Sequence, residues 1–434
     1  MTSRTRQAAV ATPSDGRLSP GRAFGAVMLL AGTMLGAGLL ALPIISADMG
    51  FGFAAVAMII LWALLTYTGL MMLEVCLAFP QFTEFQGIAR TLFGKAGALV
   101  VNTVTLLLLF TLSASYISGA AGAWGFDVSH YLGLDAPGWV MALVYTVLVA
   151  ACVFAGSDAV AGASKVFFTL NLVVLAALVA SVEPSVRLRY LAENPSQWVF
   201  IWTALPVFMT SFGFHTSIPT VVKYVGRQYP RALRKIFIVS GLIPLVAYLA
   251  WIFVSLGGLP RTGAHSFATA RAEGGGVGAF LSQIEPVIGQ SLAPNLFYVF
   301  SGVVLLTSYL ALSLSLTDIL DASISRIGRW RPQGRVRRLV VVAVCFLPPL
   351  GVVLIYPNAF VPLLGLASIF CVVTSMLFPA LALWRLQSKG ARALGLVPPS
   401  YRVLAGWGGF VVVIAGAAGI LVLQVLNMLG DLPQ

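Results

Sequence analysis

The sequence contains very little charge. Of its 434 residues only 9% are Asp, Glu, Lys or Arg, whereas 59% are hydrophobic, and the mean hydropathy is +0.95. A soluble domain needs far more charged surface than this to stay solvated. The composition therefore excludes a soluble globular protein and predicts one that resides in a membrane.

Residue types that enzymes and metal sites use are also scarce. The chain has four cysteines, none in a CxxC spacing, and three histidines. It contains no Walker loop, no dinucleotide-binding glycine motif and no recognisable set of nucleophile, base and orienting group. We therefore expect no metal site, no cofactor and no enzymatic activity.

Long apolar stretches make up most of the chain. A helix needs about 20 apolar residues to cross a bilayer. Residues 1–22 contain four Arg among Ser, Thr, Pro and Gly, and are predicted to be a disordered cytoplasmic tail. The expected fold is an all-α integral membrane protein with eleven transmembrane helices, at residues 24–45, 52–79, 98–123, 139–156, 159–182, 198–221, 236–257, 294–321, 338–356, 359–384 and 402–429.

The net charge of +12 is unevenly distributed along the chain. With the N-terminus in the cytoplasm, 21 of the 26 basic residues fall on cytoplasmic segments, four fall outside, and Lys165 lies within a span. This asymmetry follows the positive-inside rule, so it orients the chain in the lipid bilayer and does not indicate nucleic-acid binding. With eleven spans, the C-terminus is then periplasmic.

Two of the predicted spans are interrupted in the middle. Glycine and proline fall inside the first, AFGAVMLLAGTMLGAGLLALPII, and inside the sixth, WVFIWTALPVFMTSFGFHTSIPTVV. Backbone that leaves the helix within a bilayer must be buried in protein or line a cavity. A matched pair of interrupted helices in the two halves of a chain points to the binding site of a transporter.

The two interrupted spans lie five apart. Because five is an odd number, the sixth span crosses the membrane in the sense opposite to the first. We therefore predict a 5+5 inverted repeat, with residues 23–182 as the first half and 198–384 as the second. The last span, 402–429, is an accessory helix.

The breaks expose backbone groups that suit a zwitterion. The half-helix that begins near Gly36 offers N–H groups and a positive dipole end to a carboxylate. The half-helices that end near Ala31 and Thr210 offer carbonyl groups to an ammonium. No Asp, Glu, Lys or Arg lies in the middle of the first, third, sixth or tenth span, so we expect a neutral substrate side chain. The predicted substrate-binding residues are Gly32, Thr33, Gly36, Ala37, Gly38, Tyr116, Ser211, Phe212, Gly213, Phe214 and His215.

Several of these residues have a second interpretation. Gly32 and Gly36 form a GxxxG spacing, which also serves close packing of helices. The aromatic residues of the set either line the pocket or pack against neighbouring helices. His215 either contacts substrate or a proton, or is a hydrogen-bonded structural histidine.

Three ionisable residues within spans are the predicted proton-coupling groups. Lys165 either extends its amine to the membrane surface or is a buried amine whose protonation changes, because desolvation favours its neutral form. Glu74 and Asp318 each pair with Lys165, join a proton path, or lie at the interface without a role.

Several motifs resemble those of a known family. They are GTMLGAGLLALP in the first span, LWALLTYTGLMMLEV in the second, SASYISGA in the third and TSFGFHTSIPTVVKY in the sixth. Together with FLPPL and YPNAF near the ninth and tenth spans, they resemble the bacterial hydroxy and aromatic amino acid permeases, in particular the tyrosine-specific branch. The resemblance implies the amino acid–polyamine–organocation superfamily and the inverted-repeat fold of the leucine transporter.

The resemblance also implies a function. It implies import of tyrosine, tryptophan or phenylalanine by proton symport across the bacterial inner membrane, with alternating access and with the proton gradient as the driving force in place of a cofactor. By position in the superfamily, Lys165 matches a lysine of the fifth helix that occupies a sodium site in proton-coupled relatives. Thr216 departs from the glycine expected after His215, so the resemblance does not decide which aromatic amino acid is preferred. Two other functions stay open: a permease for serine or threonine, and a membrane sensor that binds amino acids without transport.

Overall fold

The computed structural model describes most of the chain, namely residues 18–155, 157–192, 198–288, 293–324, 334–403 and 406–430. Within these ranges, it leaves out the side chains of residues 37, 130, 132, 157–168, 288, 293 and 294. Nearly all of the predicted cytoplasmic tail, residues 1–22, therefore lies outside the described residues.

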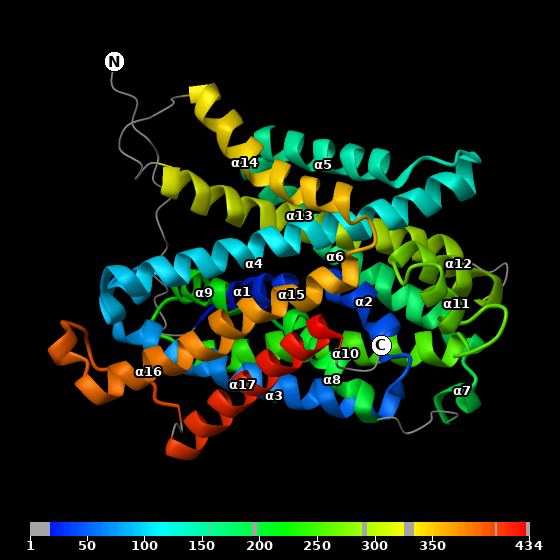
Figure 1. Cartoon of the computed structure of the whole chain (residues 1–434). Helices are drawn as coiled ribbons and strands as arrows, with labels where there is room; N and C mark the ends of the chain where they lie inside the picture. The colour runs from blue at the N-terminus through cyan, green and yellow to red at the C-terminus, as the bar shows by residue number, and fades with distance from the viewer. Residues whose placement is uncertain are drawn as a thin grey trace.

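The described part of the chain is all-helical, and most of its long helices run side by side (Figure 1). The helices are α1 (Pro20–Met34), α2 (Ala37–Ser46), α3 (Gly50–Ala78), α4 (Phe85–Leu132), α5 (Gly138–Ala155), α6 (Ser157–Val182), α7 (Leu188–Ala192), α8 (Ile201–Ser211), α9 (Ile218–Val225), α10 (Pro230–Gly258), α11 (Phe267–Ala272), α12 (Val277–Ile288), α13 (Ala293–Ile324), α14 (Gly334–Ile355), α15 (Phe360–Val372), α16 (Phe378–Lys389) and α17 (Trp407–Leu429). Short 3-10 turns, η1 (Glu183–Ser185), η2 (Trp198–Phe200), η3 (His215–Ser217) and η5 (Arg392–Leu394), and one π-helical turn, η4 (Val373–Leu377), connect or extend them.

The predicted membrane fold is confirmed. Among the described residues, nine helical segments are long and apolar enough to cross a membrane, or ten if α1 and α2 count as one bent span. The predicted fifth span, 159–182, coincides with α6, whose side chains are described only from Thr169 onward. The count of eleven spans and the inverted repeat stay predictions.

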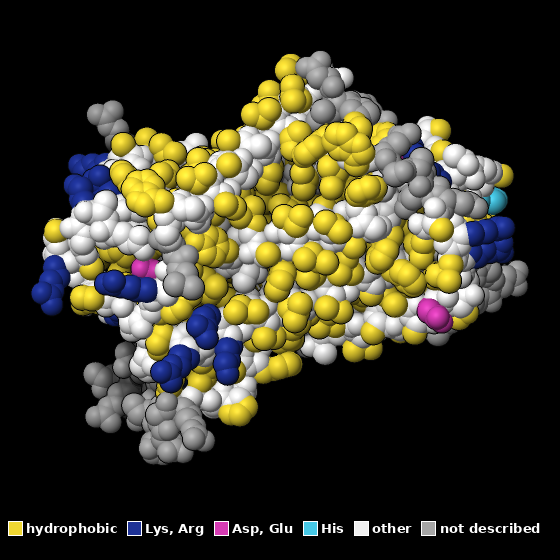
Figure 2. Space-filling view, turned by 90° about the horizontal axis from the view of Figure 1, so that it is seen from below, with side chains coloured by type: hydrophobic (Ala, Val, Ile, Leu, Met, Phe, Trp, Pro, Cys, Tyr) yellow, Lys and Arg dark blue, Asp and Glu magenta, His cyan; other side chains and the backbone are white. Residues whose placement is uncertain are grey.

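The surface of the molecule is divided into bands. In Figure 2, hydrophobic side chains cover the middle of the face and Lys and Arg gather at its left end, where α9 and α16 lie in Figure 1. Large apolar side chains such as Val147, Leu347 and Val411 are exposed on α5, α14 and α17. Such a continuous apolar band needs lipid around it. The end of the bundle that carries Lys223 and Lys389 is the basic end, and the opposite end carries α7, α11 and α12.

The first predicted break is present between α1 and α2. α1 ends at Met34, the backbone is non-helical at Leu35 and Gly36, and α2 continues from Ala37 at an angle of 50° to α1. α1 extends past Ala31, where the sequence placed its end, because the N–H of Leu35 still donates to the carbonyl of Ala31 at 3.0 Å. The N-terminus of α2 lies where the sequence predicted it.

The second predicted break is present between α8 and α9. α8 ends at Ser211, close to the predicted end at Thr210, and the backbone then leaves the helix through residues 212–214. The turn η3 leads from there into α9. Pro219 lies in the first turn of α9, where the missing N–H of a proline has no intrahelical partner to lose.

The half-helices pack at the centre of the bundle. Figure 1 shows α1 and α2 between α4 on one side and α8 and α10 on the other, and α2 contacts both α8 and α10. Gly38 permits the closest approach, because a Cβ at this position would lie only 2.7 Å from Cβ of Ser211 and 3.2 Å from its Cα. The two interrupted helices therefore touch beside their breaks.

Candidate functional site

The carbonyl ends of α1 and α8 meet at one hydroxyl group. Tyr248 on α10 is fully buried, and its Oη donates within hydrogen-bond distance of the carbonyl oxygens of Met34, at 2.6 Å, and Ser211, at 2.9 Å. These are the last carbonyls of the two half-helices, which lack an intrahelical partner. The ring of Tyr248 packs edge-on against Phe212, with 5.2 Å between the ring centroids. The two breaks are thus joined in space by a residue from a third helix.

The N-terminus of α2 has no side-chain cap. The first N–H groups of a helix have no intrahelical acceptor and form the positive end of its dipole, so they can receive an anion. In this conformation hydroxyl groups lie beside them: a Cβ on Gly36 would be 2.6 Å from Oη of Tyr116 and 3.0 Å from Oγ of Ser308. Ser308 also donates to the carbonyl of Leu35 at 3.3 Å. Side chains therefore occupy the space that the sequence assigned to a carboxylate.

The structure brings most of the predicted substrate-binding residues to the two breaks. Thr33 differs from the others, because its side chain is exposed and its hydroxyl donates to the carbonyl of Leu30 in the same helix at 2.7 Å. Gly32 lies beside it, within the last turn of α1. The side chain of Ala37 lies outside the described residues. Those gathered by direct contacts across the breaks are Gly36, Gly38, Tyr116, Ser211 and Phe212.

His215 is buried and held by a residue of α3. The hydroxyl of Thr68 lies 3.1 Å from the carbonyl oxygen of Leu65 and 2.9 Å from Nε2 of His215, so it is within hydrogen-bond distance of both. If the hydroxyl donates to Leu65, Nε2 of the neutral imidazole donates to it and Nδ1 is an acceptor; if the hydroxyl donates to Nε2, the hydrogen of the ring resides on Nδ1. Among the described residues Nδ1 has no hydrogen-bond partner. A buried ring nitrogen without a partner next to a break can form a hydrogen bond with a bound substrate.

The aromatic residues of the second break pack against neighbouring helices. Phe214 lies against Gly69 of α3, where a Cβ would be 2.6 Å from the end of the phenyl ring, and its centroid is 4.6 Å from that of His215. Gly213 lies beside Cys371 of α15, with 3.0 Å between Sγ and a Cβ built on the glycine. Packing accounts for the positions of these residues in this conformation.

The predicted coupling residues lie on three different helices, α3, α6 and α13. Glu74 is buried and accepts hydrogen bonds from the N–H of Val403 at 2.7 Å and from Nε2 of Gln387 at 3.4 Å, which anchors the segment after α16 to α3. Asp318 is exposed on α13 toward the basic end. Lys165 lies on α6, but its side chain is outside the described residues, so the pairings predicted for it are not tested.

Three residues of the site are not singled out by the sequence: Tyr248, Ser308 and Thr68. A single hydroxyl residue in an apolar span carries no periodic signal, because the surrounding positions are apolar on every side. The structure adds one more feature beside the breaks, the π-helical turn η4, which contacts η3. Such turns are often found at functional sites.

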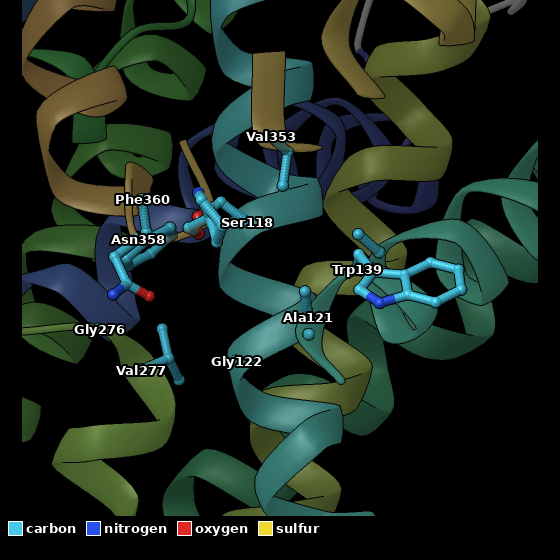
Figure 3. Close-up of a pocket in the computed structure, with 12 residues that line it drawn as sticks. Ser118, Ala121, Gly122, Trp139, Gly276, Val277, Val353, Asn358 and Phe360 are labelled. Atoms are coloured by element: carbon cyan, nitrogen blue, oxygen red, sulfur yellow. The ribbon is translucent and has the colours of Figure 1, made fainter. Parts of the chain in front are cut away.

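A cavity of about 90 Å³ lies toward the opposite end (Figure 3). Figure 3 shows Asn358 and Phe360 on one side of the α4 ribbon and Trp139 on the other. Two hydrogen bonds join α4 to the start of α15 here, from Ser118 to the carbonyl of Pro357 at 2.6 Å and from Ser115 to that of Phe360 at 2.9 Å. The cavity is lined by Ser118, Ala121, Gly122, Gly138, Trp139, Ala142, Gly276, Val277, Val353, Pro357, Asn358 and Phe360.

The chain is similar to known transporters over nearly its whole length. It is 30% identical to tyrosine-specific transport system 2 of Haemophilus influenzae, over 93% of this chain and 96% of the relative. It is 27% identical to the tryptophan-specific transport protein of Pseudomonas aeruginosa, over 95% and 96%, and 27% identical to the low affinity tryptophan permease of Escherichia coli, over 85% and 88%.

A solved structure shares the fold. A mutant of the manganese transporter of Eremococcus coleocola superposes with a TM-score of 0.62 over 94% of this chain and 88% of that one, at 14% sequence identity. At this identity the likeness concerns the fold alone.

The family model of the tryptophan/tyrosine permeases matches residues 21–424, which include both interrupted helices and every predicted site residue. Members of this family are permeases, so the protein is a multi-pass membrane transporter rather than an enzyme, and its relatives support the transport of aromatic amino acids. From its apolar helices, its paired breaks and this match, the chain belongs to the tryptophan/tyrosine permease family.

Proposed function

We propose that this protein imports an aromatic amino acid, tyrosine, tryptophan or phenylalanine, by proton symport across the bacterial inner membrane. The observation that carries the proposal is the meeting of the two breaks at Tyr248, which brings the carbonyl ends of α1 and α8 close to the uncapped N-terminus of α2. Residues 31–38 and 210–216 contain no Asp, Glu, Lys or Arg. Such a site suits a zwitterion with an uncharged side chain, and the names of the relatives favour an aromatic one.

The two charged groups of the zwitterion bind different backbone groups. The carboxylate binds at the N-terminus of α2, where the N–H groups and the helix dipole favour an anion. The ammonium donates to the carbonyl groups at the ends of α1 and α8. Substrate entry displaces the hydroxyl groups of Tyr116 and Ser308 from beside Gly36, and Tyr116 then donates to the carboxylate or packs against the ring.

The proton gradient drives accumulation through ionisable groups within the membrane. Lys165 is the principal coupling group, and Asp318, exposed on α13, is a second site of proton exchange. The hydrogen bonds of Glu74 to Val403 and Gln387 favour an anchoring role for this residue over a place on the proton path. Nδ1 of His215, which has no hydrogen-bond partner among the described residues, is a further place where the substrate ammonium can donate a hydrogen bond.

Alternating access requires that each end of the bundle open in turn. In this conformation the opposite end is held by the α4–α15 hydrogen bonds and by Asp48, which forms ion pairs with Arg261 and Arg271. By the positive-inside rule, the basic end faces the cytoplasm and the opposite end the periplasm. The contacts at the opposite end then release when the protein takes up substrate.

The test is uptake into proteoliposomes that contain the purified protein. With an imposed pH gradient, acid outside, labelled tyrosine or tryptophan should accumulate, and a protonophore should abolish the accumulation. Unlabelled tyrosine, tryptophan and phenylalanine should compete, whereas serine and threonine should not. Absence of accumulation for every aromatic amino acid would refute the proposal. Accumulation of labelled serine or threonine, but of no aromatic amino acid, would indicate a hydroxy amino acid permease, and binding without gradient-driven uptake would indicate a sensor.

A further inference from the structure

The hydroxyl of Tyr248 is a hydrogen-bond donor shared by the carbonyl groups at the two helix ends, and both breaks stay open around it. In the apolar interior of a membrane protein, a carbonyl group without a hydrogen-bond donor is costly. An uninterrupted helix avoids this cost, because the N–H four residues further along donates to the carbonyl; at a break another donor is needed. The hydroxyl of Tyr248 lies 2.6 Å from the oxygen of Met34 and 2.9 Å from that of Ser211. A partner from a separate helix therefore stabilises both ends in their interrupted form.

The stoichiometry of these hydrogen bonds leaves acceptor capacity at the site. A phenol carries one hydrogen, so at any moment it donates to one carbonyl or is shared between both. Each carbonyl oxygen has two lone pairs, so at least one lone pair on Met34 and one on Ser211 are left for another donor. An ammonium group carries three hydrogens and needs several acceptors that converge on it.

The position of Tyr248 is itself constrained. Its side chain is fully buried, and its ring packs edge-on against Phe212, the first residue after α8. The packing of its own ring therefore holds the hydroxyl beside the break at the end of α8.

We propose that Tyr248 is a positioning residue, whose hydroxyl holds the carbonyl ends of α1 and α8 in the arrangement that receives the substrate ammonium. This inference rests on the proposed function, because it assigns the ammonium subsite of that same site. Under this proposal, the hydroxyl of Tyr248 contributes to binding of the substrate ammonium and not to binding of the substrate ring or carboxylate.

The test compares two variants with two ligands. Tyr248→Phe keeps the ring and removes the hydroxyl. Tyr145→Phe is the matched control, because Tyr145 is also fully buried and its hydroxyl has no hydrogen-bond partner among the described residues. The ligands are the transported amino acid and its analogue without the amino group, 3-(4-hydroxyphenyl)propionate for tyrosine or indole-3-propionate for tryptophan. Equilibrium binding to the purified protein is measured for each pair, together with the thermal unfolding midpoint.

Tyr248→Phe should weaken binding of the amino acid about tenfold, the effect of one well-formed hydrogen bond, and leave binding of the analogue within about twofold of wild type. Tyr145→Phe should change neither. Equal weakening of both ligands by Tyr248→Phe would overturn the proposal, because the hydroxyl would then support the site as a whole. Unchanged binding of both ligands would overturn it too.

A second variant covers the case in which Tyr248→Phe does not fold. Replacement of Tyr248 by 4-aminophenylalanine keeps a donor at the same place and should bind the amino acid as wild type does; loss of binding in this folded variant would contradict the positioning role. Should the wild-type protein itself bind no aromatic amino acid, the proposed function and this inference fail together. Failure of the inference alone is recognised by normal wild-type binding without the ligand-selective effect.

Discussion

The contact between Gly38 and Ser211 allows a quantitative test of the paired breaks. Replacing Gly38 by alanine adds one methyl group, which would lie 2.7 Å from Cβ and 3.2 Å from Cα of Ser211. Carbon atoms in contact are normally about 3.5–4.0 Å apart, so α2 and α8 must separate by roughly 1 Å to accept the methyl group. Overpacking of this kind costs about 1–3 kcal/mol.

The separation should act on substrate affinity as well as on stability. It moves the N-terminus of α2 away from the carbonyl of Ser211, and a zwitterion must reach both groups. We expect Gly38→Ala to weaken binding of the aromatic amino acid about 10- to 100-fold, which corresponds to roughly 1.4–2.8 kcal/mol. The measurement is equilibrium binding in detergent, followed by initial uptake rates in proteoliposomes at matched protein content.

A compensating change separates the steric cause from other effects of the alanine. Ser211→Gly removes the Cβ and the hydroxyl that the new methyl group would meet, and keeps the carbonyl that Tyr248 binds. The double variant should recover most of the lost affinity, with a coupling of at least about 1 kcal/mol in the double-mutant cycle. Gly52→Ala is the control, because this glycine is also helical and a Cβ added to it would have no atom within 4 Å.

Either of two results would show that α2 and α8 do not meet at Gly38 and Ser211 when substrate binds. Unchanged affinity in Gly38→Ala would mean that the half-helices do not need this close contact to bind substrate. Additive effects of Gly38→Ala and Ser211→Gly would mean that the two positions do not meet in the protein that binds substrate.

Three further changes test the ionisable groups. Lys165→Ala should abolish accumulation driven by a pH gradient and leave measurable substrate binding; accumulation equal to wild type would exclude a coupling role. Thr68→Val removes the hydroxyl that holds Nε2 of His215 and should weaken substrate binding by about 1 kcal/mol, and identical affinity would argue that the imidazole does not contact substrate. Glu74→Gln should lower the thermal unfolding midpoint and retain accumulation, whereas lost accumulation at an unchanged midpoint would place this residue on the proton path.

The interruption of two helices follows from local sequence. Glycine and proline within an otherwise apolar, membrane-length run weaken the helix wherever they occur, so the breaks could be placed before any tertiary contact was known. The predicted position of the break was less accurate in the first interrupted helix than in the second. α1 continues past Ala31 to Met34, and the carbonyl of Ala31 still accepts a helical hydrogen bond from the N–H of Leu35.

The partners of the breaks did not follow from local sequence. In a soluble helix the buried face is marked by apolar periodicity, but a membrane helix is apolar all round. The sequence around Tyr248 and Ser308 therefore does not distinguish them from other polar residues in apolar spans. Their roles depend on the crossing of α10 and α13 with the interrupted helices, which brings a hydroxyl to Met34 in one case and to Leu35 in the other.

The predicted roles of individual glycines also depended on packing. Gly36 and Gly38 were predicted to line a substrate pocket, with close packing as the alternative for Gly36. Both lie at the breaks, and both are closely packed in this conformation, one against Tyr116 and Ser308, the other against Ser211. A missing side chain permits either outcome, and only the neighbouring helices decide which atoms fill the space.

The sequence by itself determined that this protein lies in a membrane, that it is helical, and that two of its helices are interrupted, because hydropathy and helix-breaking residues act within a single segment. Tertiary structure alone decided which groups meet at the interruptions. At this junction Tyr248 meets Met34, 214 residues earlier in the chain, and Ser211, 37 residues earlier, and contacts of this kind arise only when the three helices pack together.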